Sequence, residues 1–315
     1  MWVFPLSAPA GAAPTSATTP AAATSAGTAL AATSAATIKL IHLPNSAAEF
    51  TRAQLSNRFV APDWYPGSHG PMPEVVARGR APDLFACGYC HTPGGQGRPE
   101  NAALAGLPGE YIVQQVVDFQ SGARRALLPG VFPPADLMIH EAMKTTPAEA
   151  QIAAEYFSHE KLRPRVIVLE RSRVPRTQVV GSVYTPIADG GEEPLGTRLI
   201  ELARDSEQHE NRDEHMRYVA YVPPGSVARG RALARTGGGH GLTVACVTCH
   251  GAKLQGVGAV PPLAGRSPSY LLRQLLAFQT GARSGPSTLP MQPVIANLDV
   301  GKMIDVVAFA ASLQP

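Results

Sequence analysis

Two stretches of the chain place apolar residues at helical spacing, and each stretch ends at a glycine. The first predicts a helix that stops before Gly122, and the second predicts a helix that is capped by Ser269 and stops before Gly281. A last helix is expected after each, over 147–159 and 298–313. The apolar positions, which we assign to core packing, are Tyr111, Ile112, Val113, Val116, Val117 and Phe119, and Tyr270, Leu271, Leu272, Leu275, Leu276 and Phe278.

The segment between the two helical regions has a different pattern. Short runs rich in β-branched residues at 165–170, 177–187, 197–203 and 217–225 are bounded by Gly and Pro, and they predict strands. We therefore expect a small strand-rich connector over 164–224. Two roles for it stay open, namely fixing the distance between the helical regions and binding a partner.

The two helical regions are copies of one another. The segment "LAGLPGEYIVQQVVDFQSGAR" (104–124) aligns without a gap with "LAGRSPSYLLRQLLAFQTGAR" (263–283), and "VARGRA" occurs at both 76–81 and 227–232. Identities in register at this level indicate an internal duplication. We predict one domain over 70–163 and a second over 225–315.

The N-terminal residues fit neither pattern. Residues 1–38 form an Ala/Ser/Thr/Pro-rich tract with too few bulky apolar side chains to fold, so we expect disorder. A secretory leader needs a basic start and a solid apolar run, and "MWVFPL" is only a fragment of one. The tract is thus an atypical leader, an altered leader or the product of a misassigned start. Residues 39–69 are expected to form an arm packed on the first domain.

Composition narrows the function. A formal charge of +3 argues against nucleic-acid binding, which needs a dense basic face. The chain has no continuous apolar run of about 18 residues, so no transmembrane segment is expected. Aromatic residues are few, at 6%, for two ordinary cores. A large bound group could supply the missing apolar volume.

All four cysteines lie in two short motifs, "CGYCH" at 87–91 and "CVTCH" at 246–250. A redox disulfide within each pair gives no reason for the two histidines. A zinc site needs four ligands, and each domain offers two cysteines and one adjacent histidine. CxxCH is the attachment signature of c-type haem. In that interpretation Cys87 and Cys90, and Cys246 and Cys249, hold two covalent haem c groups, and His91 and His250 ligate iron.

The register of the repeat selects candidates for the opposite side of each iron. When the last helices are aligned, Met138 falls opposite Met291, whereas Met143 falls opposite Ala296. We therefore predict Met138 and Met291 as the distal ligands, with Met303 in the core and His140 as a rival of Met138. The first copy has six extra residues between His and Met, which we place in a loop within 126–136.

The order of CxxCH, "PPLAG", a helix ending in "FQTGAR", a methionine and a helix containing "AFAASL" resembles the class I cytochrome c family, in a tandem arrangement similar to the dihaem cytochrome c4 type. The resemblance covers the two repeats and not the N-terminal tract or the connector. It implies an all-α fold with His/Met ligation of each iron. It also implies that the carbonyl groups of Pro262 and Ala103 accept the Nδ1–H of the proximal histidines.

The chain is accordingly expected to be a periplasmic dihaem electron carrier and not an enzyme, with redox proteins of unknown identity as partners. One alternative is a haem-bearing electron-acceptor subunit of a periplasmic or membrane dehydrogenase for alcohols, sugars or sulfur compounds. Another is a dihaem peroxidase, which would need one open distal site. Four residues that recur in the repeats have two interpretations, contact with haem propionates or simple helix capping: Tyr111, Arg124, Tyr270 and Arg283.

Overall fold

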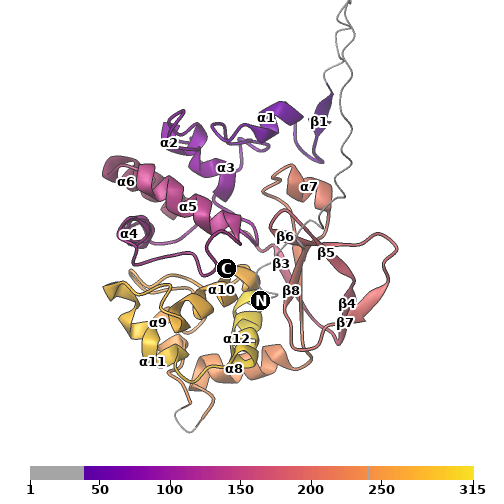
Figure 1. Ribbon diagram of the computed structural model, residues 1–315, viewed down its shortest axis with the longest axis vertical. Coiled ribbons are helices and arrows are strands. Elements are labelled where there is room, and N and C mark those ends of the chain that lie inside the picture. The colour runs from indigo at the N-terminus through magenta and orange to yellow at the C-terminus, as the bar shows by residue number, and fades with distance from the viewer. Residues whose placement is uncertain (1–38, 240–241) are drawn as a thin grey trace, which may run out of the picture.

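A computed structural model describes residues 39–239 and 242–315. The predictions made for residues 1–38 therefore lie outside the described residues. Figure 1 shows two helical regions, one above the other, with a sheet beside both. The upper region contains α2 (Glu74–Ala77), α3 (Cys87–His91), α4 (Gly109–Gln120), α5 (Pro133–Lys144) and α6 (Pro147–His159). The lower contains α8 (Ser226–Thr236), α9 (Val247–His250), α10 (Pro268–Gln279), the 3₁₀ helix Pro286–Met291, α11 (Gln292–Ile295) and α12 (Val300–Ser312).

The repeat read from the sequence is also a repeat of structure. Helices α4 and α10 each have 12 residues, and α6 and α12 each have 13. Gly122 and Gly281 follow the first pair with φ values of 75° and 71°, the left-handed backbone that ends a helix. The prediction that Ser269 caps α10 is wrong by two residues. The N-cap is Ser267, whose hydroxyl accepts from the N–H of Tyr270, and Ser269 lies inside the first turn.

The repeated "VARGRA" segment folds differently in the two copies. In the second copy it lies within α8, where Gly230 packs so closely on α12 that an added Cβ would lie 1.9 Å from the Asp305 oxygen. In the first copy α2 ends at Ala77, and Gly79 has a φ of 65°. Pro82 follows three residues later, and proline disfavours helical backbone in the residue before it. The helix of the first copy is therefore much shorter.

The connector forms a five-stranded sheet in the order β3-β9-β8-β6-β5. Its β3–β9 and β6–β8 pairs are parallel, and its β8–β9 and β5–β6 pairs are antiparallel. The all-α class therefore holds for the tandem helical regions and not for the whole chain. The strands are β3 (Val166–Glu170), β5 (Thr177–Val180), β6 (Val183–Pro186), β8 (Ile200–Ala203) and β9 (Tyr218–Val222), with a separate β4 (Arg173–Pro175) and β7 (Glu192–Pro194) pair and the short helix α7 (Ser206–Glu210).

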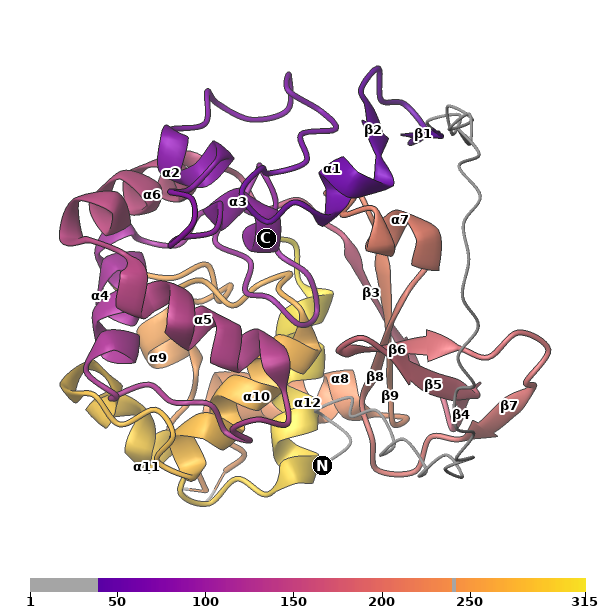
Figure 2. The same ribbon diagram turned by 45° about the horizontal axis from the view of Figure 1, so that its top comes forward.

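The sheet is packed into the second helical region. Leu199 and Val222 of the connector belong to the same buried cluster as Leu233 of α8 and Met303 of α12. In Figure 2 the strands stand directly beside α8 and α12. Burial of this shared apolar surface makes the connector part of the core and not a loose linker.

The N-terminal arm comprises β1 (Leu40–His42), β2 (Glu49–Thr51), α1 (Arg52–Ser56) and an extended segment. It contacts the first helical region through the main chain, where the Ala61 N–H donates to the Ala77 oxygen over 2.8 Å. It also contacts the connector, where the indole of Trp64, 1% exposed, donates to the Asn211 oxygen over 2.7 Å. The arm therefore ties the connector to the first helical region.

Candidate functional site

Each CxxCH segment folds as a short helix that brings its cysteines together. In α3 the residues Cys87 and Cys90 are three positions apart, so they lie on one face about one turn from each other. In the second copy the N–H of His250 donates to the Cys246 oxygen over 2.9 Å and closes the corresponding turn. The chain then leaves each helix through positive φ, 66° at Thr92 and 83° at Gly251, which directs both histidines into the interior.

Both histidine rings are buried and oriented by one main-chain hydrogen bond. Nδ1 of His91 lies 2.7 Å from the Ala102 oxygen, and Nδ1 of His250 lies 2.8 Å from the Pro261 oxygen. A carbonyl only accepts, so Nδ1 carries the proton and Nε2 keeps its lone pair. Burial lowers the pKa of both rings, against the opposing effect of these hydrogen bonds. Each ring is thus a neutral donor suited to a metal.

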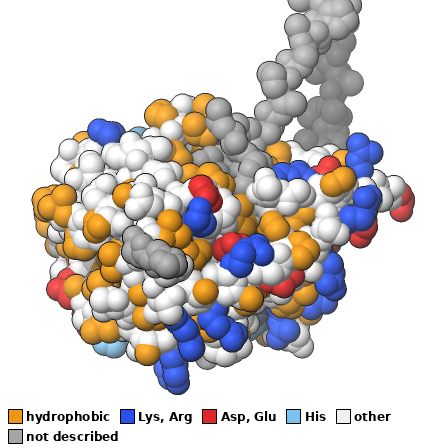
Figure 3. Space-filling view, turned by 90° about the horizontal axis from the view of Figure 1, so that it is seen from below, with side chains coloured by type: hydrophobic (Ala, Val, Ile, Leu, Met, Phe, Trp, Pro, Cys, Tyr) orange, Lys and Arg blue, Asp and Glu red, His pale blue; other side chains and the backbone are white. Residues whose placement is uncertain are grey.

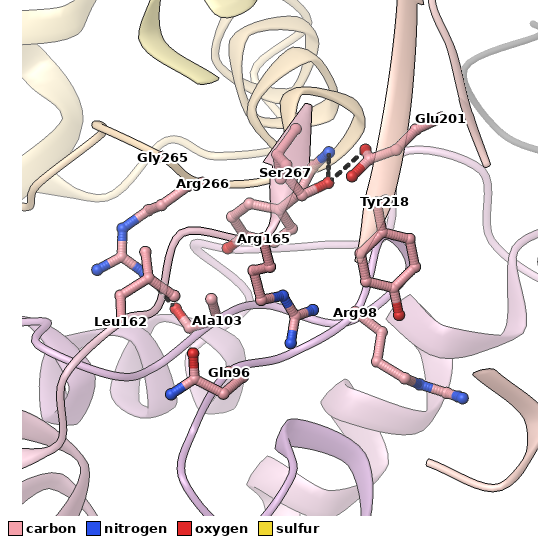
Figure 4. Close-up of a pocket in the computed structure, with 12 residues that line it drawn as sticks. Gln96, Arg98, Ala103, Leu162, Arg165, Glu201, Tyr218, Gly265, Arg266 and Ser267 are labelled. Carbon is pink, nitrogen blue, oxygen red and sulfur yellow. Dashed lines mark hydrogen bonds between the residues drawn. The ribbon is translucent and has the colours of Figure 1, made fainter. Parts of the chain in front are cut away.

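The family resemblance implied that the Ala103 and Pro262 carbonyls accept from the two histidines, and this prediction is wrong by one residue in each copy, since Ala102 and Pro261 accept instead. The Pro262 and Ala103 oxygens accept instead from Arg266, over 2.8 Å to Nε and 2.7 Å to Nη1. Figure 4 shows the Arg266 side chain reaching toward Ala103. In an extended segment successive residues face opposite sides, so the neighbours of Ala102 and Pro261 turn away from the histidines.

A cavity of about 520 Å³ lies next to α3 and is the right kind of space for a large cofactor. Its wall includes Cys87, Cys90, His91 and Met138. Most of the remaining wall is apolar, contributed by Leu104, Leu107, Ile112, Phe119 and Phe132, among others. A thiol pair, a neutral imidazole and a thioether around one apolar cavity fit a covalently attached haem.

The protonation of the thiols agrees with attachment and not with thiolate ligation. Burial raises the pKa of Cys87 to about 12 and of Cys246 to about 11. A zinc ligand must be a thiolate, whereas these environments favour the neutral sulfur. Across 39–239 and 242–315, no group of three or more His, Cys, Asp and Glu residues is arranged to hold a metal ion.

The candidate distal methionine of the first copy lies on a helix. Met138 is half-buried on α5 and lines the cavity, whereas Met143 of the same helix is 59% exposed. His140, the rival ligand, is exposed and its Nδ1 lies 3.0 Å from the Glu141 carboxylate. The loop predicted within 126–136 is therefore shorter than expected. Its last residues belong to α5, because Pro133 and Pro134 occupy the first turn of that helix.

The candidate of the second copy has a different local structure. Met291 is the half-buried last residue of the 3₁₀ helix, and Met303 is fully buried in α12 as expected for the core. Pro290 and Pro293 lack the N–H groups that a continuous α-helix needs here. Met138 and Met291 thus occupy equivalent positions in the aligned repeats, but Met138 lies in an α-helix and Met291 in a 3₁₀ helix.

Sequence reasoning missed the residues that brace the first site from the connector. Arg212, which lines the cavity, donates through Nη1 to the Tyr89 oxygen over 2.9 Å. Glu214 accepts from the Gly94 N–H over 2.7 Å and from the Ser68 hydroxyl over 2.6 Å. These contacts join positions up to 146 residues apart, so no local pattern reports them. The sequence feature that could have indicated these residues is "NRDEH" at 211–215, because it groups charged side chains in a chain with only 16% charged residues.

Comparisons with known proteins find relatives among the cytochromes. No family model matches the chain. A thiosulfate dehydrogenase electron acceptor from Thiomonas intermedia is 27% identical over 208 residues, which are 65% of this chain and 67% of that protein. Cytochrome c-554(548) from Halomonas halodenitrificans is 33% identical over 70 residues, 22% of this chain and 84% of that protein. The solved thiosulfate dehydrogenase (TsdBA) from Marichromatium purpuratum matches with a TM-score of 0.50 and 27% identity, over 75% of this chain and 38% of that one.

A helical repeat that places CxxCH and a buried, oriented histidine beside an apolar cavity defines a c-type cytochrome, and the chain belongs to this family. The 208-residue match is longer than either repeat. The chain is an electron-transfer protein with two covalently bound haem c groups and their iron. Within 39–239 and 242–315, none of the helices has the length and apolar character to cross a bilayer.

Proposed function

We propose that Cys87 and Cys90 attach one haem and Cys246 and Cys249 the other, with His91 and Met138, and His250 and Met291, as axial ligands. The observation that carries this proposal is the cavity of the first helical region, which is lined by Cys87, Cys90, His91 and Met138. The two domains of the proposal are 70–163 and 225–315, with 164–224 as the connector and 39–69 as the arm.

The protein residues have three tasks in this arrangement. The Ala102 and Pro261 carbonyls orient the histidine rings and leave Nε2 unprotonated, so that His91 and His250 would hold the iron of a bound haem. The apolar walls exclude water, and the methionine thioethers supply soft donors that favour high reduction potentials. The bound haem supplies a one-electron Fe(III)/Fe(II) couple. Two such sites in one chain form a relay.

The axial assignment is tested with paired methionine variants. Met138→Ala and Met291→Ala should each remove about half of the weak sulfur-to-iron absorption band and lower one reduction potential. Met143→Ala is the matched control, because Met143 is on the same helix as Met138 and is exposed. A pyridine haemochrome assay should give two haems per chain throughout. An intact band in both variants would contradict the assignment.

We further propose that the chain is the periplasmic electron acceptor of an oxidoreductase that oxidises thiosulfate or a related sulfur compound. Support comes from the named roles of the Thiomonas and Marichromatium relatives. The chain itself then transfers electrons and does not bind the substrate. The placement of Met138 on a 12-residue helix, and not in a loop, disfavours the displaceable ligand that a peroxidase needs.

The partner should recognise a mixed surface and not a strongly charged one. On the face shown in Figure 3, Lys and Arg side chains are interspersed with acidic and hydrophobic ones, which agrees with a formal charge of +3. The test is anaerobic mixing of the oxidised protein with a thiosulfate dehydrogenase and thiosulfate, followed by absorbance. Rapid reduction is expected, and an alcohol dehydrogenase with its substrate is the control. Reduction by the control enzyme alone would overturn the proposed partner.

A further inference from the structure

Two short segments, 102–105 and 261–264, carry the carbonyl groups that orient the proximal histidines. We call them the first and second acceptor segments. They occupy equivalent positions in the repeats, because the gap-free alignment begins at Leu104 and Leu263 and each histidine acceptor lies two residues before.

The N–H groups of each acceptor segment bond within their own repeat. Those of Leu104 and Ala105 both donate to the Gly95 oxygen, over 2.8 and 2.9 Å. In the second acceptor segment the two equivalent N–H groups donate to the Leu254 oxygen, over 2.8 and 3.1 Å. The neighbouring main-chain oxygens are left for a donor from elsewhere.

That donor is Arg266, which lies just before α10. Its Nη1 donates to the Ala103 oxygen over 2.7 Å and its Nη2 to the Ala105 oxygen over 2.9 Å. Its Nε donates to the Pro262 oxygen over 2.8 Å. Ala103 and Pro262 directly follow the two histidine acceptors, so one guanidinium group joins equivalent points of both acceptor segments.

The guanidinium group is held by these oxygens and not by a carboxylate. Arg266 is 5% exposed, and none of the ion pairs within 39–239 and 242–315 includes it. A buried charge is costly without hydrogen bonds, so these oxygens have to stay directed at it. The planar fork of arginine then fixes their directions relative to one another.

The contact is made by one repeat only. Leu107 occupies the position of Arg266 in the first repeat, and it packs in the apolar core with Phe157. A residue that served only its own repeat would be expected twice, as Gly122 and Gly281 are. A single arginine that bonds to both acceptor segments instead connects one copy to the other.

The two repeats are also joined at a second place, in the segments that follow α4 and α10. There Arg124 and Arg283 are opposite one another in an antiparallel bridge. A main-chain hydrogen bond of 2.8 Å lies on each side of this pair, from Arg125 to Ala282 and from Ser284 to Ala123. These bonds use main-chain atoms, so a side-chain substitution at Arg266 should loosen the acceptor segments without separating the repeats.

We propose that Arg266 is a positioning residue for both proximal histidines. By fixing the Ala103 and Pro262 carbonyls, it holds the preceding peptides so that their oxygens stay on the Nδ1–H groups of His91 and His250. That hydrogen bond sets the orientation and basicity of each ring, so one side chain tunes both haem sites. This inference rests on the proposed axial roles of the two histidines.

The test measures hydrogen exchange of the two Nδ1–H protons by ¹⁵N NMR of the reduced dihaem protein. Each signal is assigned by the contacts of its ring within its own repeat. Arg266→Gln should make both protons exchange about tenfold faster, because both acceptor carbonyls lose the bond that fixes their neighbour. Faster exchange at one ring only, or at neither, would overturn the proposal.

Arg165→Gln is the matched control. Arg165 is also buried, at 8% exposed, but it belongs to the connector. Its guanidinium donates to the Gly97 oxygen over 2.6 Å and to the Glu214 oxygen over 3.4 Å, and both lie outside the acceptor segments. This variant should leave exchange at His250 unchanged. An equal increase there would show that loss of any buried arginine loosens the ring, and it would contradict the role of Arg266.

Arg266→Lys separates charge from geometry. Lysine keeps the positive charge, but a single ammonium group does not present the planar fork, so at least one ring should still exchange faster than in the wild type. Wild-type exchange at both rings would show that charge alone suffices and would refute the proposal. The same spectra report the axial roles separately, because a histidine that does not bind iron has an Nε2 resonance that moves as the ring titrates.

Discussion

The guanidinium carbon of Arg212 lies 3.6 Å from the centroid of the Tyr89 ring, and Nη1 of Arg212 donates to the Tyr89 main-chain oxygen. Tyr89 is the central residue of CGYCH, whereas Arg212 belongs to the connector. The connector thus braces the attachment segment of the first repeat. The equivalent residue of the second repeat is Thr248, which is exposed. The two attachment segments are therefore held differently.

Removal of this brace should destabilise the first repeat. Arg212→Ala loses the cation–π contact and the hydrogen bond, at a cost of about 1–3 kcal/mol. Arg212 has a φ of 60°, so Arg212→Gly loses the same contacts but relieves left-handed strain of about 1 kcal/mol. In thermal unfolding of the dihaem protein, the wild type should have the highest midpoint, Arg212→Gly a lower one and Arg212→Ala the lowest. The exposed Arg171→Ala is the control, and an equal loss there would contradict the brace.

The His69 ring should make stability depend on pH. Its Nε2 lies 3.2 Å from Asp63 Oδ1 and its Nδ1 lies 2.7 Å from the Gly70 oxygen. Although burial acts in the opposite direction, these partners raise the pKa of His69 to about 9. A raised folded-state pKa stabilises the fold below the unfolded value, about 6.5, and this stability is lost as the pH rises through about 9.

His69→Gln should therefore cost about 1–3 kcal/mol at pH 6 and less at pH 10. Urea unfolding of wild type and variant at both pH values measures the difference. His159→Gln, at an exposed histidine, is the matched control. A cost that is the same at pH 6 and pH 10 would show that protonation of His69 does not contribute.

Gly230 should not tolerate any side chain. In Gly230→Ala the new Cβ would lie 1.9 Å from the Asp305 oxygen, so α8 and α12 would have to move apart. The expected cost is about 1–3 kcal/mol or more, as for other overpacked cores. Gly67→Ala is the control, because nothing lies within 4 Å of a Cβ at that position. Equal unfolding midpoints for the two variants would refute the close approach.

The sequence predicted those features that depend on local periodicity or on the repeat. Helix α6 has the bounds expected for it, and α4 and α10 stop at Gln120 and Gln279, just before Gly122 and Gly281. Strands occur in each of the four runs of the connector. Short-range spacing and turn residues determine these elements, so a single sequence reports them.

Features that depend on the direction of a group or on distant contacts were not predictable in this way. Whether Ala102 or Ala103 presents its carbonyl to His91 is set by the path of an extended segment, and Arg266 competes for the second carbonyl. The repeat showed that Arg124 and Arg283 are equivalent, but equivalence does not reveal that their segments pair with each other. The axial roles of Met138 and Met291 stay predictions.

The reciprocal pairing of Arg124 with Arg283 has the symmetry of a contact between two identical subunits, in which one patch recognises itself. In a homodimer such a contact weakens on dilution. Here both patches belong to one covalent chain, so their effective concentration is fixed by the connector and not by the amount of protein. Two metal centres therefore keep one mutual orientation at any dilution, and a partner protein always meets them as a single unit.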